Sequence, residues 1–444
     1  MMTAAGPAAP GGAVRGGFRS ALGGLTTRGR SFLAAGVAAG ACAYVLGQPD
    51  LLRVGLLLAA LPLVCVAVLY RTRHRVTGSR RLSPRRVAAG AEARVRLRMD
   101  NVSRVPTGLL MLQDHVPYVL GPRPRFVLDR VEPGGKREVS YRVRSDLRGR
   151  YPLGPLQLRL SDPFGMCELT RSFGAHDTLT VLPRTEPLPA VRLTGEAPGH
   201  GDGRHGAPSG VGEDDVIPRE YRYGDDLRRV HWRSTARYGE LMVRREEQPR
   251  RARGTVLLDT RARAYGSDEP DPSFEWAVSG AASVVTHLLE RGYAVRLLTD
   301  AGEALPGDGS DGYVAPGHGA ADAAGLMMEA LAVVGHSGEA GLDRAHDVLR
   351  AGSEGLLIAF FGELDEAQAE LAGRMRRRSG AAVAFVRDGG GDGAAAAVRH
   401  LREAGWSAVP VRPDDPLASL WRHAARDAGA VAGSGTTGSS GGWS

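Results

Sequence analysis

The chain has 444 residues, which is enough for two or three domains. Its formal net charge is +8, but Lys136 is the only lysine, so 56 of the 57 basic residues are arginine. A bare basic balance supports only non-specific attraction to nucleic acid, so we expect no nucleic-acid partner. The three cysteines, Cys42, Cys65 and Cys167, are too few and too scattered for a disulfide framework or a metal cluster.

Two apolar runs lie close to the N-terminus. Residues 31–47 contain no charge, and a second run at 51–70 carries only Arg53, near its end. A helix needs about 20 residues to cross ~30 Å of hydrocarbon, and the Gly and Ala residues of the first run suit close helix packing. The sequence therefore predicts a transmembrane hairpin over 31–70 with a minimal turn at Pro49.

Arginines flank this hairpin on both sides. No acid precedes Asp50, and none interrupts the arginine block that follows Tyr70. By the positive-inside rule we expect a two-pass protein of the cell membrane with both termini in the cytoplasm. A signal peptide cleaved near residues 41–43 is the alternative, but the arginine block argues against export of the remainder.

Residues 76–190 have the pattern of a β-sandwich. At 91–99 the odd positions are apolar and the even positions from Glu92 to Arg98 are charged, which indicates a half-buried strand. The same period recurs at 139–143 and 156–160, and Gly-Pro and Pro-Gly turns separate the runs at the spacing of an immunoglobulin-like sandwich. A Gly- and Pro-rich linker follows. Its histidines, His200 and His205, have no companion ligands at metal-binding spacing.

The densest feature is the stretch 219–247, which holds eight Arg, six Asp or Glu, one His and one Trp. Buried charges are tolerated when they are paired, so we interpret the stretch as a paired polar network. Leu227, Val230, His231 and Ser234 have helical spacing, Gly239 suits a C-terminal cap, and the residues from Leu241 to Val243 alternate like a strand.

From Gly254 onward short apolar runs alternate with helical stretches. The runs at 255–259, 294–299, 356–361, 382–386 and 407–411 suit buried strands; the stretches at 274–291, 320–334, 366–378, 394–404 and 417–428 suit helices. This alternation predicts an α/β domain with a doubly wound parallel sheet. The tail from Gly433 has the composition of a disordered segment.

The central stretch resembles the signature of the family called domain of unknown function fifty-eight. The matching positions are Arg219, Tyr221, Gly224, Asp225, Asp226, Arg228, Val230, His231, Trp232, Thr235, Ala236, Arg237, Gly239, Leu241, Val243 and Glu247. The resemblance extends to the membrane hairpin, to the sandwich with its RGRYPLGPLQLRLSDPFG hairpin at 148–165, and to the α/β domain, which it identifies as similar to von Willebrand factor A.

The resemblance implies protein partners. Family members typically look like partners of MoxR-type AAA+ ATPases, often beside transglutaminase-like membrane proteins. Von Willebrand A domains often hold Mg²⁺ through D-x-S-x-S after the first strand; here Asp259 would be the first ligand, but Arg261 and Arg263 replace both serines. Because guanidinium groups repel a divalent ion, we expect this position to be degenerate, with no metal and no cofactor.

We therefore expect a membrane-anchored, cytoplasm-facing adaptor or scaffold that engages protein partners. Two alternatives stay open: a hydrolase-like enzyme that uses His231 as a base with Asp225 or Asp226, and a purely structural joint. No nucleophile elbow, HExxH motif or Walker loop supports an enzyme. The expected organisation is a cytoplasmic tail at 1–30, the hairpin at 31–70, the sandwich at 76–190, a linker at 195–212, the signature at 213–248, the α/β domain at 254–430 and a disordered tail at 433–444.

Overall fold

The computed structural model divides the chain into two compact units, Met1–Pro183 and Arg184–Ser444. It describes residues 23–73, 76–104, 106–162, 164–191, 218–221, 230, 232–244, 252–266, 270–306, 312–314, 320–352 and 354–433. The expected linker at 195–212, the tail after Gly433 and the first 22 residues lie outside the described residues.

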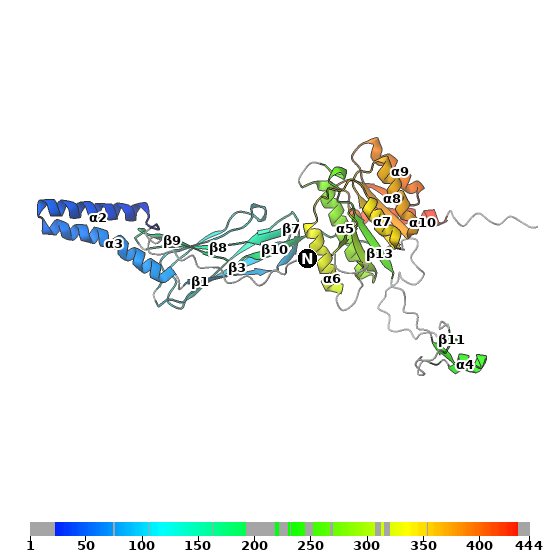
Figure 1. Cartoon of the computed structure of the whole chain (residues 1–444), viewed down its shortest axis with the longest axis horizontal. Coiled ribbons are helices and arrows are strands. Elements are labelled where there is room, and N and C mark those ends of the chain that lie inside the picture. Colours follow the sequence, from blue (N-terminus) through cyan, green and yellow to red (C-terminus); the bar gives the residue numbers. More distant parts are fainter. Residues whose placement is uncertain are drawn as a thin grey trace, which may run out of the picture. The chain divides into compact units, whose positions relative to one another are not determined.

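The first unit begins with two apolar helices, α2 (Thr27–Leu46) and α3 (Pro49–Arg73), which pack side by side (Figure 1). Both are long and apolar enough to cross a membrane. A Cβ added at Gly36 would lie 2.6 Å from the Ala59 nitrogen, so glycine is required where the two backbones approach closely.

The turn between these helices is short, as expected, but it lies before Pro49. Gly47 takes a positive φ of 63° as the C-cap of α2, and Pro49 already belongs to α3. Proline is well suited to the first position of a helix because the N–H that it lacks would have no helical partner there. Asp50 then lies in the first turn of α3 and pairs with Arg53 at 2.9 Å, with both side chains exposed.

β-Sandwich-like sheets follow in the same unit. One sheet has the order β1-β3-β6, a second β2-β10-β7 and a third β5-β4-β8-β9. The strands are β1 (Val76–Ser83), β2 (Arg86–Ala88), β3 (Glu92–Asn101), β4 (Leu110–Asp114), β5 (Arg125–Leu128), β6 (Lys136–Arg144), β7 (Gly149–Leu153), β8 (Leu156–Ser161), β9 (Glu168–Phe173) and β10 (Asp177–Leu182), with a short helix η1 (Tyr118–Leu120) between β4 and β5.

The period-two prediction for β3 is confirmed. Ala93, Val95, Leu97 and Met99 are at most 1% exposed, whereas Arg94 and the other arginines between them face solvent. The apolar face of β3 belongs to a core that it shares with the other sheets. That core also includes Leu25, Val66 and Leu69 from the base of the helical hairpin. The hairpin and the sheets are therefore packed as one body.

The second unit contains a parallel sheet of order β15-β14-β13-β16-β17-β18, in which only β15 is antiparallel. Its strands are β13 (Arg253–Leu258), β14 (Ala294–Thr299), β15 (Ala304–Leu305), β16 (Glu354–Phe361), β17 (Ser379–Arg387) and β18 (Ser407–Val411). Every residue of β14 is buried, as expected of a strand covered on both faces.

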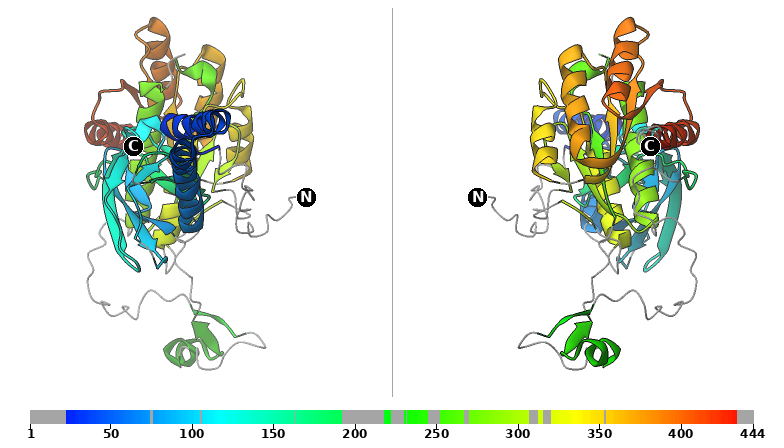
Figure 2. Two further views of the ribbon diagram at one scale, coloured as in Figure 1. Left: turned by 90° about the vertical axis from the view of Figure 1, so that its left-hand side faces the viewer. Right: turned by 90° about the vertical axis from the view of Figure 1, so that its right-hand side faces the viewer.

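Helices cover both faces of this sheet (Figure 2). They are α5 (Pro272–Glu290), α6 (Ala320–Val333), α7 (Asp343–Ala351), α8 (Glu366–Met375), α9 (Asp392–Glu403) and α10 (Leu417–Gly433), with short helices η3 (Ala262–Ala264) and η4 (Arg376–Arg378). α5 and α10 share a face, because the rings of His287 and Trp421 lie 5.8 Å apart, whereas α7, α8 and α9 pack into a separate core cluster.

The predicted alternation of strands and helices is confirmed, but α7 and β15 were not expected. α7 is short and mostly polar, and only Ala345 and Leu349 of its nine residues are buried, so no apolar run marks it in the sequence. The preceding residues 184–191 lie along α5 and α10: the Glu186 N–H donates to Ser283 Oγ at 2.9 Å, and Trp421 Nε1 donates to the Pro189 carbonyl at 3.2 Å.

Candidate functional site

The central stretch forms two short strands and a helix. β11 (Pro218–Glu220) pairs antiparallel with β12 (Met242–Arg244), and α4 (Trp232–Tyr238) lies between them in the chain. Gly239 has a φ of +77° and donates its N–H to the Thr235 carbonyl at 2.9 Å, which confirms the predicted helix end. The Met242 N–H donates to Thr235 Oγ1 at 3.0 Å and fixes the start of β12, one residue after the predicted strand start at Leu241.

Several predicted signature residues cannot be placed in this geometry. Gly224, Asp225, Asp226, Arg228, His231 and Glu247 lie outside the described residues. Arg219 lies in β11, opposite Val243, and Tyr221 donates its N–H to the Leu241 carbonyl at 2.8 Å. The hydrolase-like alternative with His231 therefore stays a hypothesis.

The described part of α4 carries large exposed side chains. Trp232 is 72% exposed and Tyr238 is 63% exposed, and Arg233 and Arg237 also face solvent on the same two turns. Exposed Trp, Tyr and Arg are the residues most enriched at the energetic centres of protein interfaces. This composition suits recognition of another protein.

A second group of polar residues lies at the carboxyl end of β13. Asp259 follows the strand, and Arg261 donates from Nε and Nη2 to its two carboxylate oxygens at 2.9 and 2.8 Å. Both side chains are at most 2% exposed. Burial lowers the pKa of the Arg261 guanidinium, but the bonds to Asp259 outweigh this and raise it above its usual value. The pair is therefore a fixed, internally neutralised ion pair.

A second buried carboxylate, Asp300, lies beside this pair at the end of β14. Its Oδ1 accepts hydrogen bonds from the Thr260 N–H at 2.7 Å and from Thr260 Oγ1 at 2.5 Å, and its Oδ2 accepts from Ser337 Oγ at 2.6 Å. Asp300 is not among the residues predicted from the sequence, although its position directly after the apolar run 294–299 is a signal for it.

The chemistry of these side chains does not fit a divalent cation. The Arg261 guanidinium donates to both oxygens of the Asp259 carboxylate, whereas Arg263 is exposed and donates to the Ala340 carbonyl at 2.9 Å. Within the described part of the chain no group of three or more His, Cys, Asp or Glu side chains is placed to hold a metal.

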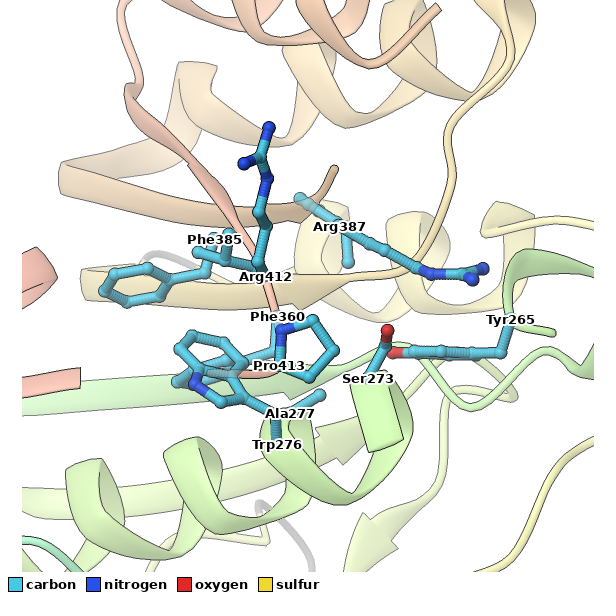
Figure 3. A pocket seen from close by; sticks show the side chains of 11 residues that line it. Tyr265, Ser273, Trp276, Ala277, Phe360, Phe385, Arg387, Arg412 and Pro413 are labelled. Atoms are coloured by element: carbon cyan, nitrogen blue, oxygen red, sulfur yellow. The ribbon is translucent and has the colours of Figure 1, made fainter. Parts of the chain in front are cut away.

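A small aromatic pocket opens at the same carboxyl edge, near the ends of β16, β17 and β18 (Figure 3). The rings of Phe360 and Phe385 stack at 5.0 Å, and Trp276 of α5 contacts both. Arg387 and Arg412 also line it and pair with Glu363 at 3.7 Å and Asp388 at 2.8 Å, respectively. Its cavity volume is about 10 Å³, room for about one water molecule and far below the ~300–1,000 Å³ of small-molecule sites.

The fold and these sites define a protein with two apolar N-terminal helices, β-sandwich-like sheets and an α/β unit built on a parallel sheet. Residues 218–378 match the model of the family described as protein of unknown function DUF58. This match covers the central stretch and most of the parallel sheet.

A curated relative is the uncharacterised protein YeaD of Bacillus subtilis (strain 168). It is 28% identical over 162 residues, which are 35% of this chain and 37% of the relative, so the chain covers little more than a third of that protein's length.

Solved structures resemble this chain only in part. The CARDB domain of the PF1109 protein from Pyrococcus furiosus is 12% identical over 24% of this chain and 87% of that chain, with a TM-score of 0.19. Spo0M, the sporulation control protein of Bacillus subtilis, is 12% identical over 24% of this chain and 49% of that chain, with a TM-score of 0.16. Scores this low carry no functional argument.

Proposed function

We propose that the protein is a membrane-anchored adaptor that presents its signature stretch and its α/β unit to protein partners in the cytoplasm. In this proposal α2 and α3 span the cell membrane as a two-pass hairpin with both termini in the cytoplasm. The sandwich-like sheets are of immunoglobulin-like type, and the α/β unit is similar to von Willebrand factor A.

The observation that carries the proposal is the exposed aromatic and arginine surface of α4. Trp232, Tyr238 and Arg237 face solvent together, and truncation of exposed Trp, Tyr or Arg at an interface centre costs about 2 kcal/mol or more of binding free energy. The residues at the carboxyl edge of the parallel sheet also favour a binding protein over an enzyme. Its buried carboxylates are bonded internally, and its pocket is too small for an ordinary substrate.

Membrane insertion is supported by the surface of the hairpin. Leu57 is 70% exposed, Val45 82% and Leu56 61%, which leaves a large apolar surface on α2 and α3 that a lipid bilayer would cover. The resemblance of the signature implies the partner class, a MoxR-type AAA+ ATPase, with transglutaminase-like membrane proteins as neighbours.

The test is affinity capture of the tagged full-length protein from detergent-solubilised membranes. We expect an AAA+ ATPase, identified by mass spectrometry, to co-purify with the wild type and to be lost with Trp232→Ala or Arg237→Ala. Because both side chains are exposed, the melting temperature should not change. Capture without an AAA+ ATPase would refute the proposed partner. Loss of binding together with a lower melting temperature would favour the structural-joint alternative.

A further inference from the structure

The turn between β8 and β9 is joined to the first turn of α2. The Thr26 N–H donates to the Met166 carbonyl at 2.9 Å, and Thr26 Oγ1 donates to the Gly165 carbonyl at 2.7 Å. On the other side of the turn, the Glu168 N–H donates to the Gly24 carbonyl at 2.8 Å. Three hydrogen bonds thus hold the turn against the residues at which α2 begins.

The packing at this junction leaves little freedom. A Cβ added at Gly29 would lie 2.2 Å from the Met166 carbonyl oxygen, so α2 and the turn are in direct backbone contact. Leu25 and Cys167 are buried in the same core as Val66 of α3. The turn therefore keeps a fixed depth relative to both apolar helices.

Asp162 shapes the turn from within. It is 7% exposed, and its two carboxylate oxygens accept the N–H groups of Cys167 at 2.6 Å and Phe164 at 3.0 Å. The charge of Asp162 is thus bonded inside the turn. The Phe164 side chain, in contrast, is 59% exposed at its tip.

The charged residues of α2 indicate where the tip of the turn lies relative to the apolar part of the helix. Arg28 and Arg30 lie in the first turn of α2 and are exposed, and the charge-free stretch begins directly after them at Ser31. Arginines at the end of an apolar helix lie at the headgroup level of a bilayer, where aromatic rings are also enriched. Phe164 is therefore held next to the level at which the apolar span begins.

We propose that the turn between β8 and β9 is a membrane-contact site at which the Phe164 ring enters the headgroup region of the bilayer that holds α2 and α3. The partner is the lipid surface itself. Bonding of the Asp162 carboxylate within the turn keeps its charge from the lipid, and Arg28, 3.8 Å from a Cβ built on Gly165, supplies a cation for lipid phosphates beside the ring. This inference rests on the proposed membrane insertion of the hairpin.

The experiment places the photoreactive residue p-benzoylphenylalanine at one of three positions of the full-length protein. These are Phe164, Leu57 on the outer face of α3, and Tyr118, which is 91% exposed on η1. Each variant is reconstituted into vesicles of phosphatidylethanolamine and phosphatidylglycerol, irradiated, and analysed by mass spectrometry for a protein–lipid adduct. All three side chains are exposed, so the fold should tolerate the replacements, and melting temperatures verify this.

We expect lipid adducts at positions 57 and 164 and none at 118. An adduct at 57 without one at 164 would overturn the membrane-contact site and leave the membrane hairpin intact. Absence of an adduct at 57 would refute membrane insertion itself, and with it the basis of this inference. Equal adducts at 118 and 164 would show non-specific lipid contact and would also overturn the proposal.

Discussion

Arg261 lies two residues after Asp259 in the chain and donates a hydrogen bond to each oxygen of its carboxylate, with both side chains buried. The cation that neutralises this acid is therefore part of the chain. We predict that Arg261→Ser destabilises the α/β unit by about 3–5 kcal/mol, because it leaves a buried carboxylate without its counter-charge. Thermal unfolding of the purified protein in detergent measures this loss.

The same variant should acquire sensitivity to divalent cations. Without the guanidinium, the carboxylates of Asp259 and Asp300 become available as ligands. Together with the hydroxyls of Thr260 and Ser337, they are hard oxygen donors of the kind that Mg²⁺ prefers. We expect millimolar Mg²⁺ to raise the melting temperature of Arg261→Ser but not that of the wild type. Arg263→Ser is the matched control, because Arg263 is exposed and makes no pair with Asp259. An equal loss of stability in both variants would contradict the assigned role of Arg261.

Contacts between residues close together in the chain can be predicted from the sequence, whereas contacts between distant residues cannot. The polar residues around Asp259 show both cases. The position of Asp259 after a buried strand and the arginines at 261 and 263 were visible, because they are local in the chain. The sequence does not show which of the two arginines binds the acid, because Arg261 is placed by the bend after β13 and by a bridge to Ser337. The contact of Thr260 with Asp300 joins residues 40 positions apart and leaves no local pattern.

In the sandwich-like sheets, too, local patterns could be predicted and long-range contacts could not. Alternation predicted the buried face of β3, because a strand exposes every second side chain. The bond between Thr26 and the turn at Gly165 joins residues 139 positions apart, so the junction of hairpin and sheets could not be predicted. The RGRYPLGPLQLRLSDPFG segment could be recognised as a motif, but its contact with α2 required the structure.

A buried ion pair should control the stability of the sandwich-like sheets. Arg80 and Asp114 are at most 2% exposed and 2.5 Å apart, and the Tyr141 hydroxyl donates to Asp114 Oδ2 at 2.6 Å. Burial and this bond to a carboxylate raise the pKa of Tyr141, so the hydroxyl keeps its proton and remains a donor. We predict that Asp114→Asn costs about 3–5 kcal/mol, because Arg80 then lacks its main counter-charge.

Hydrogen exchange of the amides of β1 and β4, the strands that carry Arg80 and Asp114, measures this loss locally. Glu132→Gln serves as the control, because Glu132 and Arg130 form a pair in which both side chains are more than 60% exposed. Such surface pairs contribute about 0–1 kcal/mol. If the two variants changed the protection of these amides by the same amount, the buried pair would not have the importance we assign to it.

The outer face of the sheet β1-β3-β6 places like charges opposite one another. Arg96 of β3 lies directly across from Arg81 of β1, and both are exposed. Like charges in this register are unfavourable, so we predict that Arg96→Glu stabilises the protein by roughly 0.5–1 kcal/mol at low salt. Denaturant unfolding at two salt concentrations tests this, since screening should reduce the gain.

Arg98→Glu is the matched variant, because it changes the net charge equally. Arg98 lies across from Glu138 and pairs with Asp100 at 3.1 Å, so its reversal should destabilise the protein. Stabilisation by both substitutions would indicate that the overall net charge matters and that the register does not.

His287 should make the α/β unit sensitive to mild acid. It is 8% exposed on α5 against Trp421, and its pKa lies below the usual 6.5, first because of burial and second because of the nearby Arg291 cation. The folded state therefore resists protonation more than the unfolded state does. The contribution of His287 to the stability of the folded state is complete above about pH 6.5. It decreases as the pH falls below about 6.5 toward the lowered pKa of the folded state.

We predict that His287→Phe, which keeps a ring against Trp421 and removes the titrating group, flattens this dependence. Relative to the variant, the wild type should lose stability as the pH falls from 7 to 5, measured as the unfolding midpoint in urea at each pH. His423→Gln is the control, because this histidine is largely exposed and pairs with Asp427 at 3.5 Å. If the two variants showed the same pH dependence as the wild type, burial of His287 would not be the cause of the acid sensitivity.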